Sequence, residues 1–299
     1  MIHLSSERCV LSLSAAAPPA ARVPDGGRVE LDTADCFAGQ IHAGGGTPES
    51  IDWGRINPAT GPVYVEGAEP GDALSVFVER IEVAAQGLMA VSSSFGVLRE
   101  RVDGLRFAVV PLQDGIARLP GGASVPVQPM IGVLGVAPRG EAVPCGSPGP
   151  HGGNMDTRLL GQGATLHLPV FVPGALLAAG DLHAAMGDGE VCGTGVEVAG
   201  RVVLRLAVRR DLRLSNPLLE TADVLATIAS AETLDEAADR ATADMADLLI
   251  SRLGLSLADS TMLMSAAGHL QVCQVVDPLK TARFSLAKAV VEQLGSRLL

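Results

Sequence analysis

Polar side chains that could bind a metal ion are concentrated between residues 149 and 197. Asp181 and His183 are two residues apart, so an extended strand points both side chains to one face, where they can chelate one cation. Asp188 and Glu190 repeat that spacing among glycines that allow the chain to turn back. The spacing therefore predicts that the two pairs converge on one divalent metal site.

A second polar stretch, PGPHGGNMD at residues 148–156, precedes these pairs. Its last residue, Asp156, would complete a set of one histidine and two or three carboxylates, which suits zinc or another borderline divalent ion. Gly152 and Gly153 permit close approach of the backbone, and their N–H groups would be free to bind an oxyanion. The two stretches together predict a metal site beside an anion-binding loop.

Other histidines in the chain have plainer interpretations. His167 alternates with apolar residues in ATLHLPVFV, which is typical of a structural histidine in a strand. His42 precedes three glycines and lies near acidic residues such as Asp52, so a role at the site stays open for both. Glycine-rich segments with Asp and Asn are also typical of turns, which is the alternative interpretation of the whole polar region.

The composition of the 299-residue chain excludes several classes of protein. Apolar residues make up 47% and charged residues 18%, which excludes a disordered chain. The net charge is −11 and the only lysines are Lys280 and Lys288, so we do not expect nucleic-acid binding. Aromatic residues account for only 3%, which favours a small polar ligand over one that stacks on rings.

The cysteine pattern indicates a reducing compartment. The five cysteines are odd in number, widely spaced and without a C-x-x-C pair, which argues against disulfides and a cysteine zinc knuckle. Residues 9–17, CVLSLSAAA, are preceded by Glu7 and interrupted by serine, so we expect a β-strand there and not a signal peptide. Residues 119–138 carry four prolines, which disfavours a membrane helix. We therefore expect a cytoplasmic protein without membrane association.

The first two hundred residues are patterned as β structure. Alternating or short apolar runs between turn signals predict strands at residues 28–32, 72–83, 131–136, 164–172 and 196–208, the last split around Ala199 and Gly200.

The last third of the chain changes to helical patterning. Residues 233–253 are rich in helix formers. Thr233 and Glu236 fit a capping box at the start, and Gly254 fits the end. A second helix is expected over residues 257–267, followed by a strand over 270–276.

These elements predict a mainly β fold with a C-terminal helical hairpin, α+β overall. We expect a single compact unit, or two interlocked parts, with a β body over residues 1–215 and an α+β part over 216–299.

Five stretches of the sequence resemble the acetamidase/formamidase family. They are NPATGPVYVEGAEPGD at 57–72, PMIGVLGVAP at 129–138, PGPHGGNMD at 148–156, LPVFVPGALLAAGDLHAAMGDGEVCGTGVE at 168–197, and LQVCQVVDP at 270–278. The resemblance implies hydrolysis of a short primary amide, of the formamide or acetamide type, to a carboxylate and ammonia. It also implies a β-sandwich with a CUB-like component, a divalent metal and a homodimer. Zinc is the favoured ion, and carboxylate-rich ligation would also accept calcium or magnesium.

The resemblance carries over to eight motif positions, which are His151, Asn154, Asp156, Asp181, His183, Asp188, Glu190 and Glu197. We expect Asp156, Asp181 and His183 to hold the metal, which lowers the pKa of a bound water and polarises the amide oxygen. Glu190 would take the proton from that water and return it to the departing nitrogen.

The remaining positions are expected to contact the substrate. His151, with the N–H groups of Gly152 and Gly153, would orient the amide or stabilise the oxyanion, and Asn154 would bind the substrate. The sequence does not assign roles to Asp188 and Glu197.

One departure and three alternatives bear on the activity. Met186 stands where the family usually has Gln, which removes hydrogen-bonding groups near the site and affects the identity of the amide. Covalent catalysis by Cys192, or by the serine cluster at residues 92–94, would need a nearby lysine. A hydrolase of a larger amide and a non-catalytic small-ligand-binding protein are the other two alternatives.

Overall fold

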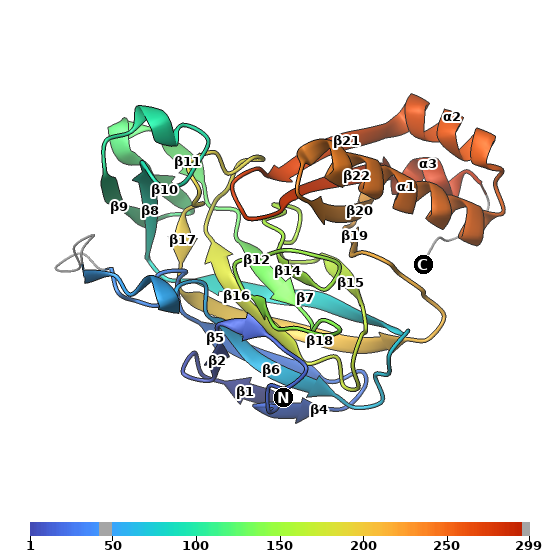
Figure 1. Ribbon diagram of the computed structural model, residues 1–299, viewed down its shortest axis with the longest axis horizontal. Coiled ribbons are helices and arrows are strands. Elements are labelled where there is room, and N and C mark those ends of the chain that lie inside the picture. The colour runs from blue at the N-terminus through green and yellow to red at the C-terminus, as the bar shows by residue number, and fades with distance from the viewer. Residues whose placement is uncertain (42–49, 295–299) are drawn as a thin grey trace.

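The chain folds into two large mixed β-sheets with helices near its C-terminal end (Figure 1). The computed structural model describes residues 1–41 and 50–294. The mainly β architecture with a C-terminal helical hairpin confirms the predicted fold class.

The first sheet has nine strands and runs through both the N-terminal and the C-terminal parts of the chain. Its strands pair antiparallel except for the parallel pair of β1 and β5. In spatial order they are β1 (Ile2–Leu4), β5 (Arg28–Thr33), β18 (Gly200–Arg209), β7 (Ala73–Val83), β15 (Thr165–Pro169), β19 (Leu218–Glu220), β20 (Val224–Ala231), β22 (Lys280–Ala287) and β21 (Gly268–Gln274).

The second sheet has eleven strands. Its main path is β11 (Ser124–Pro126), β10 (Ile116–Arg118), β9 (Leu105–Gln113), β8 (Gln86–Ser92), β17 (Glu197–Val198), β16 (Leu177–His183), β12 (Met130–Gly135) and β14 (Gly152–Asn154). Strand β6 (Ala59–Val65) joins it through β16 and carries β2 (Cys9–Val10) and β4 (Ala21–Val23). A separate pair consists of β3 (Ser12–Leu13) and β13 (Val143–Pro144).

The two sheets bury a common apolar core between them. On β5 the side chains of Val29 and Leu31 are fully buried, whereas the alternating residues Glu30 and Asp32 are only partly buried. The same core cluster includes Ile131 and Leu182 from the second sheet. Period-two alternation therefore fixes which face of each strand points inward.

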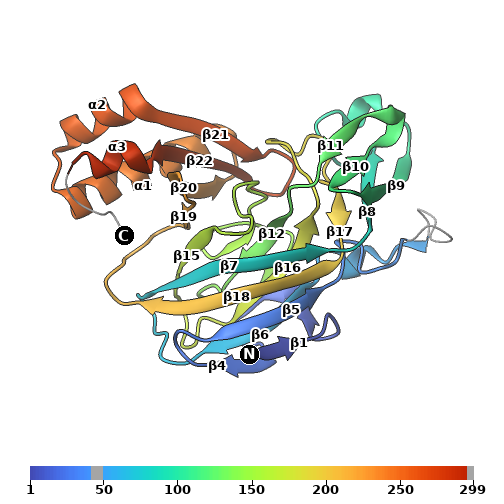
Figure 2. The same ribbon diagram turned by 180° about the vertical axis from the view of Figure 1, so that it is seen from behind.

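The helices pack on the C-terminal half of the nine-stranded sheet (Figure 2). Helix α1 (Leu234–Leu253) begins at Thr233, whose hydroxyl accepts from the N–H of Glu236, and ends at Gly254 in the left-handed conformation, as predicted. Its buried face, which includes Met245 and Leu249, packs on β20 and β22. Helix α2 (Leu257–Ala267) and the short helix α3 (Lys288–Glu292) complete this end of the molecule.

Several details differ from the sequence-based expectation. Residues 9–17 form two short strands in different sheets rather than one, because Ser12 starts a separate pairing with β13. Strands β8 and β9, which pair along a hairpin, were not predicted. His42 lies outside the described residues, and Asp52 accepts from Gly54 N–H in a short 3₁₀ turn.

Within the described residues, no helix combines the length and the apolar content that crossing a lipid bilayer requires.

A polar cluster links strands of the nine-stranded sheet to the C-terminal helix α3. His167 on β15 bonds Ser75 at 2.6 Å, and its Nε2 lies 3.7 Å from a carboxylate oxygen of Glu220 on β19. The other carboxylate oxygen of Glu220 accepts from Lys288 Nζ at 2.5 Å. His167 and then Lys288 hold the pKa of Glu220 down at about 2.

Replacing Glu220 with Gln should therefore reduce stability in a pH-dependent way. Because the folded pKa lies below the ordinary value of 4.5, the stabilisation is fully present above pH 4.5 and is lost as pH falls towards 2. At neutral pH we expect the free energy of unfolding of Glu220→Gln to be lower than that of the wild type by about 1 kcal/mol or less, since the Glu220–Lys288 pair is partly exposed. Urea unfolding at several pH values measures it, with the exposed Glu66→Gln as the control. If the loss of unfolding free energy in Glu220→Gln became larger as the pH falls, the lowered pKa of Glu220 would be contradicted.

Candidate active site

A single histidine forms the centre of a buried carboxylate cage. Nε2 of His183 lies 3.2 Å from a carboxylate oxygen of Glu197, 3.7 Å from Asp181, and 3.8 Å from both Asp156 and Glu190. All five side chains are buried. We refer to these five residues as the cage.

The second sheet and its loops bring the cage together from four segments of the chain. Asp181 and His183 lie on β16, and Glu197 lies directly opposite His183 on β17. Asp156 follows β14, and Glu190 lies in the loop between β16 and β17. The paired spacing of Asp181 and His183 thus places both side chains on one side of the strand.

The backbone at the cage adopts conformations that are rare for these residue types. Asp156, Asp181 and Glu190 have φ angles of 45°, 54° and 47°, in the left-handed region that usually favours glycine. Such conformations cost free energy and are concentrated at functional sites. Strained backbone therefore sets the direction of three of the four carboxylate side chains.

Two glycines leave room for the cage side chains. A Cβ atom on Gly132 would lie 2.5 Å from Asp156 Oδ1 and 2.9 Å from Asp181 Oδ2. A Cβ atom on Gly195 would lie 2.6 Å from His183 Nδ1. Both positions therefore require glycine if the cage is to keep this geometry.

Burial and mutual repulsion set the charge state of the cage. Burial raises the pKa of Asp156 to about 7 and that of Glu197 to about 8, and it raises the pKa of Glu190 well above the usual range. Burial opposes protonation of His183, but the negative carboxylates, Glu197 foremost, outweigh it and raise the pKa of this imidazole. In the described part of the chain, none of the four carboxylates pairs with Arg or Lys.

The donor set fits a divalent cation. Polar atoms of the cage that are buried without a hydrogen-bond partner are both carboxylate oxygens of Asp156, Oδ1 of Asp181, Oε2 of Glu197 and both ring nitrogens of His183. Buried polar atoms are normally paired, so this concentration of unpaired acceptors needs a positive partner. Carboxylate oxygens and imidazole nitrogen are the ligands that zinc and similar ions accept.

The predicted oxyanion loop is arranged differently from the expectation. The N–H of Gly152 donates to Gly149 O at 3.0 Å in a tight turn, so the prediction that it is free was wrong. Gly153 pairs with Leu134 within the sheet. His151 is buried against this turn, and burial lowers its pKa to about 4, so its ring is neutral near pH 7. No contact recorded among the described residues joins His151 to the cage.

Asn154 connects the cage region to the C-terminal part of the chain. Its Nδ2 donates to Asp277 Oδ2 at 3.0 Å. Desolvation and the charge of Asp156 raise the pKa of Asp277 well above its usual range. Asp277 lies in the motif LQVCQVVDP, but the sequence did not lead us to expect a role for it. It is the one acidic residue of that motif, and this was the feature that could have identified it.

Only one member of the predicted Asp188–Glu190 pair reaches the cage. Asp188 instead forms a two-pronged ion pair with Arg283 on β22, at 3.0 and 2.6 Å. The neighbouring Gly189 bonds through its N–H to Cys273 O and through its C=O to Val275 N–H. The C-terminal strands therefore hold the loop that carries Glu190. The prediction that the Asp181–His183 and Asp188–Glu190 pairs converge on one ion was wrong, because Asp188 pairs with Arg283.

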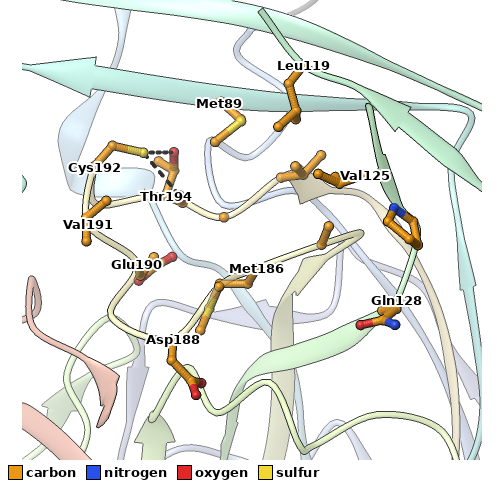
Figure 3. Close-up of a pocket in the computed structure, with 15 residues that line it drawn as sticks. Met89, Leu119, Val125, Gln128, Met186, Asp188, Glu190, Val191, Cys192 and Thr194 are labelled. Atoms are coloured by element: carbon orange, nitrogen blue, oxygen red, sulfur yellow. Dashed lines mark hydrogen bonds between the residues drawn. The ribbon is translucent and has the colours of Figure 1, made fainter. Parts of the chain in front are cut away.

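A cavity of about 390 Å³ adjoins the cage at Glu190 (Figure 3). Its other lining side chains are mostly apolar, with Met89, Leu119, Val125 and Met186 labelled in the figure. In this view Met186 lies between Glu190 and Gln128, the main polar group on the opposite side. A small molecule in this cavity would contact Glu190, one of the five cage residues.

The fold and the site together define a mainly β protein with a buried carboxylate–histidine centre suited to a divalent cation. The chain belongs to the acetamidase/formamidase family, whose family model matches residues 14–144 and 140–278. This membership confirms the resemblance carried by the sequence motifs.

The chain is similar to several solved structures and curated proteins. A protein described as a predicted acetamidase/formamidase from the thermophile Thermoanaerobacter tengcongensis is 49% identical with a TM-score of 0.96, over 99% of this chain and 98% of that one. An acetamidase from Bacillus halodurans is 47% identical with a TM-score of 0.95, over 98% and 100%. A formamidase from Methylophilus methylotrophus is 24% identical over 274 residues, 70% of this chain and 67% of its own. The chain spans between 61 and 67% of the length of the curated relatives that it matches.

The glycine at position 132 supplies a test of the cage. We expect Gly132→Ala to displace Asp156 and Asp181 and to weaken zinc binding by about 10–100-fold, with a stability cost of about 1–3 kcal/mol. Equilibrium dialysis against zinc followed by elemental analysis measures the affinity. Gly187→Ala is the matched control, because nothing lies within 4 Å of a Cβ there. Equal zinc affinity in the two variants would show that these carboxylates do not hold the ion.

Proposed function

We propose that this protein hydrolyses primary amides to a carboxylate and ammonia at the cage, with a bound divalent metal. The observation that carries the proposal is the ring of unpaired carboxylate oxygens around His183, reached through a cavity at Glu190. Similarity to proteins named acetamidase and formamidase supports the choice of amide as the substrate.

Asp156, Asp181 and His183 would hold the ion, which we propose to be zinc, with calcium or magnesium as alternatives that carboxylate ligands also accept. When bound, the cation would polarise the amide carbonyl and lower the pKa of water at the site. Glu197 lies nearest to His183, and its other oxygen accepts from Gly195 N–H at 2.7 Å. Glu197 therefore fixes the orientation of the imidazole as well as adding negative charge.

Glu190 is the cage residue that also lines the cavity, so it can contact both water and substrate. Burial, with the charge of Asp156 next, raises its pKa, so this carboxyl group holds a proton more readily than an exposed glutamate does. We assign to Glu190 the removal of a proton from the attacking water and its delivery to the amide nitrogen, which leaves as ammonia. The two backbone hydrogen bonds of Gly189, to Cys273 and Val275, hold the chain in place next to Glu190.

The size of the cavity also admits amides larger than acetamide. Pockets for drug-sized ligands begin at roughly 300 Å³, and this cavity has about 390 Å³ with a largely apolar lining. Met186, Met89 and Leu119 would contact an aliphatic acyl chain, while its amide end meets Glu190. A primary amide with a medium-length aliphatic chain is therefore the second candidate substrate.

Covalent catalysis by Cys192 is less well supported. Cys192 lines the cavity, and its thiol bonds Thr194 O at 3.3 Å. Among the described residues neither lysine bonds Cys192: Lys280 donates to Asp277 O and Lys288 to a carboxylate oxygen of Glu220. A thiol nucleophile at this position would therefore lack the lysine that such amidases use.

Replacing Glu190 with Gln should separate proton transfer from metal binding. We expect ammonia release from acetamide to fall by about 10²–10⁴-fold, the usual contribution of a general base. Metal content should stay unchanged, because Asp156, Asp181 and His183 remain. Ammonia assays and elemental analysis on the same preparations measure both. Loss of the metal together with activity would make Glu190 a ligand and overturn its assignment as the base.

Filling the cavity should change the preference among amides. We expect Met186→Trp to lower the ratio of kcat/KM for hexanamide to that for acetamide by about tenfold or more, since each methylene in an apolar pocket is worth roughly 1–3 kcal/mol. Met262→Trp is the control, because Met262 is exposed on α2. An unchanged ratio in the Met186 variant would show that the acyl chain binds elsewhere.

A further inference from the structure

A serine, a histidine and a glutamate lie next to one another on the outer face of the nine-stranded sheet. Ser75, His167 and Glu220 belong to the neighbouring strands β7, β15 and β19, and Ser75 lies directly opposite His167. Their neighbours along the chain, such as Leu74 and Leu166, belong to the apolar core between the sheets. Because side chains alternate along a strand, the three polar groups point away from that core.

These three side chains line a cavity that is separate from the one at the cage. It has a volume of about 280 Å³, and Thr165 and Arg205 also line it. Of the described residues, none lines both cavities. The outer face of the sheet can therefore hold a small molecule against Ser75 and His167.

The geometry orients the histidine as a base toward the serine. Ser75 Oγ lies 2.6 Å from Nδ1 of His167, and Nε2 of the same ring lies 3.7 Å from Oε2 of Glu220. A nearby carboxylate favours the tautomer with the proton on Nε2, which leaves Nδ1 to accept from the Ser75 hydroxyl. A nucleophile within hydrogen-bond reach of a base, with a third group beside that base, is the arrangement of serine hydrolases.

Glu220 has the charge and the position that this arrangement requires. Lys288 donates to its other oxygen at 2.5 Å, so Oε2 is the oxygen next to His167. His167 and then Lys288 hold the pKa of Glu220 at about 2, so this carboxylate is ionised near neutral pH. It can therefore stabilise the imidazolium that forms when His167 takes a proton. A purely structural histidine would need neither an ionised partner nor an adjoining cavity.

We propose that Ser75, His167 and Glu220 form a second hydrolytic site, which acts on small carboxylic esters. Ser75 Oγ forms a bond to the ester carbonyl carbon while its proton passes to Nδ1 of His167. The imidazolium then gives this proton to the alcohol as the ester bond breaks. Water, deprotonated by His167, attacks the acyl group, the carboxylic acid is released, and the proton returns to Ser75. Water is the only co-reactant.

The cavity restricts the kind of ester. Arg205 and Arg209 flank Ala207, which lies directly opposite Ser75 on β18, and both arginines line the cavity. Their guanidinium groups are therefore the donors available to the negative charge that develops on the ester oxygen. The volume is below the roughly 300 Å³ at which pockets for drug-sized ligands begin, so both the acyl and the alcohol groups must be small.

A fluorophosphonate tests the site without turnover, because it reacts with a serine that a neighbouring base activates. Full-length protein is treated with the reagent, and intact mass with peptide mapping locates the adduct. Wild-type protein should carry one adduct, in which fluoride has left and Ser75 Oγ is bonded to phosphorus. Ser75→Ala should lose it, and His167→Gln should slow labelling by about 10²–10⁴-fold. Ser285→Ala is the matched control, because it removes another buried serine of the same sheet.

Glu220→Gln separates a catalytic role of the row from a structural one. This variant should stay folded, and we expect it to slow labelling by about tenfold or more, since the imidazolium loses its ionised partner. Hydrolysis of p-nitrophenyl acetate measures turnover and should continue in protein from which chelation has removed any metal. Wild-type protein and Ser285→Ala should hydrolyse the ester equally, and Ser75→Ala should lose this activity.

Each other outcome contradicts the second site and leaves amide hydrolysis at the cage untouched. No adduct, an adduct on another residue, or equal labelling of wild type and His167→Gln overturns it. Labelling of Ser75 without ester turnover overturns the hydrolytic function. Ester hydrolysis that stops on chelation would place this activity at the cage. If Ser75→Ala does not fold, the adduct map of wild-type protein decides.

Discussion

The burial of four carboxylates around one imidazole is the constraint on which the rest of this structure depends. Transfer of even one ionised carboxylate out of water costs several kcal/mol unless a positive partner compensates it. Within the described chain no arginine or lysine pairs with the cage, so its charges are balanced by protons or by a cation. The raised pKa values of Asp156 and Glu197 reflect balance by protons. The proposed metal site corresponds to balance by a cation.

The fold is arranged to hold these groups in place despite that cost. Strands β16 and β17 supply three of them, with His183 and Glu197 directly opposite each other. Glycines at 132 and 195 leave out the side chains that would collide with the cage. Left-handed backbone at Asp156, Asp181 and Glu190 adds local strain, which the surrounding sheet must overcome. The ion pair of Asp188 with Arg283 on β22 ties the Glu190 loop to the nine-stranded sheet, so both large sheets contribute to the site.

Sequence reasoning identified the fold class and the segments that form the cage, and it failed where side-chain direction depends on tertiary structure. The capping residues of α1 and the alternation in β5 and β7 are local signals, and the structure follows them. The spacing of Asp188 and Glu190 is the same as that of Asp181 and His183. However, the Asp188 carboxylate forms an ion pair with Arg283, 95 residues away along the chain, and no local pattern predicts this. Asp277 comes from a distant segment, and no local pattern links it to residues 149–197. The predicted metal identity, homodimer and cytoplasmic location stay predictions.

Ammonia release from formamide and acetamide, before and after chelation, tests the central claim most directly. The protein is assayed as prepared, after removal of metal with elemental analysis to confirm it, and after restoration of one divalent ion at a time. The cage account predicts activity that disappears with the metal and returns with zinc. Full activity in protein shown to be free of metal would contradict it.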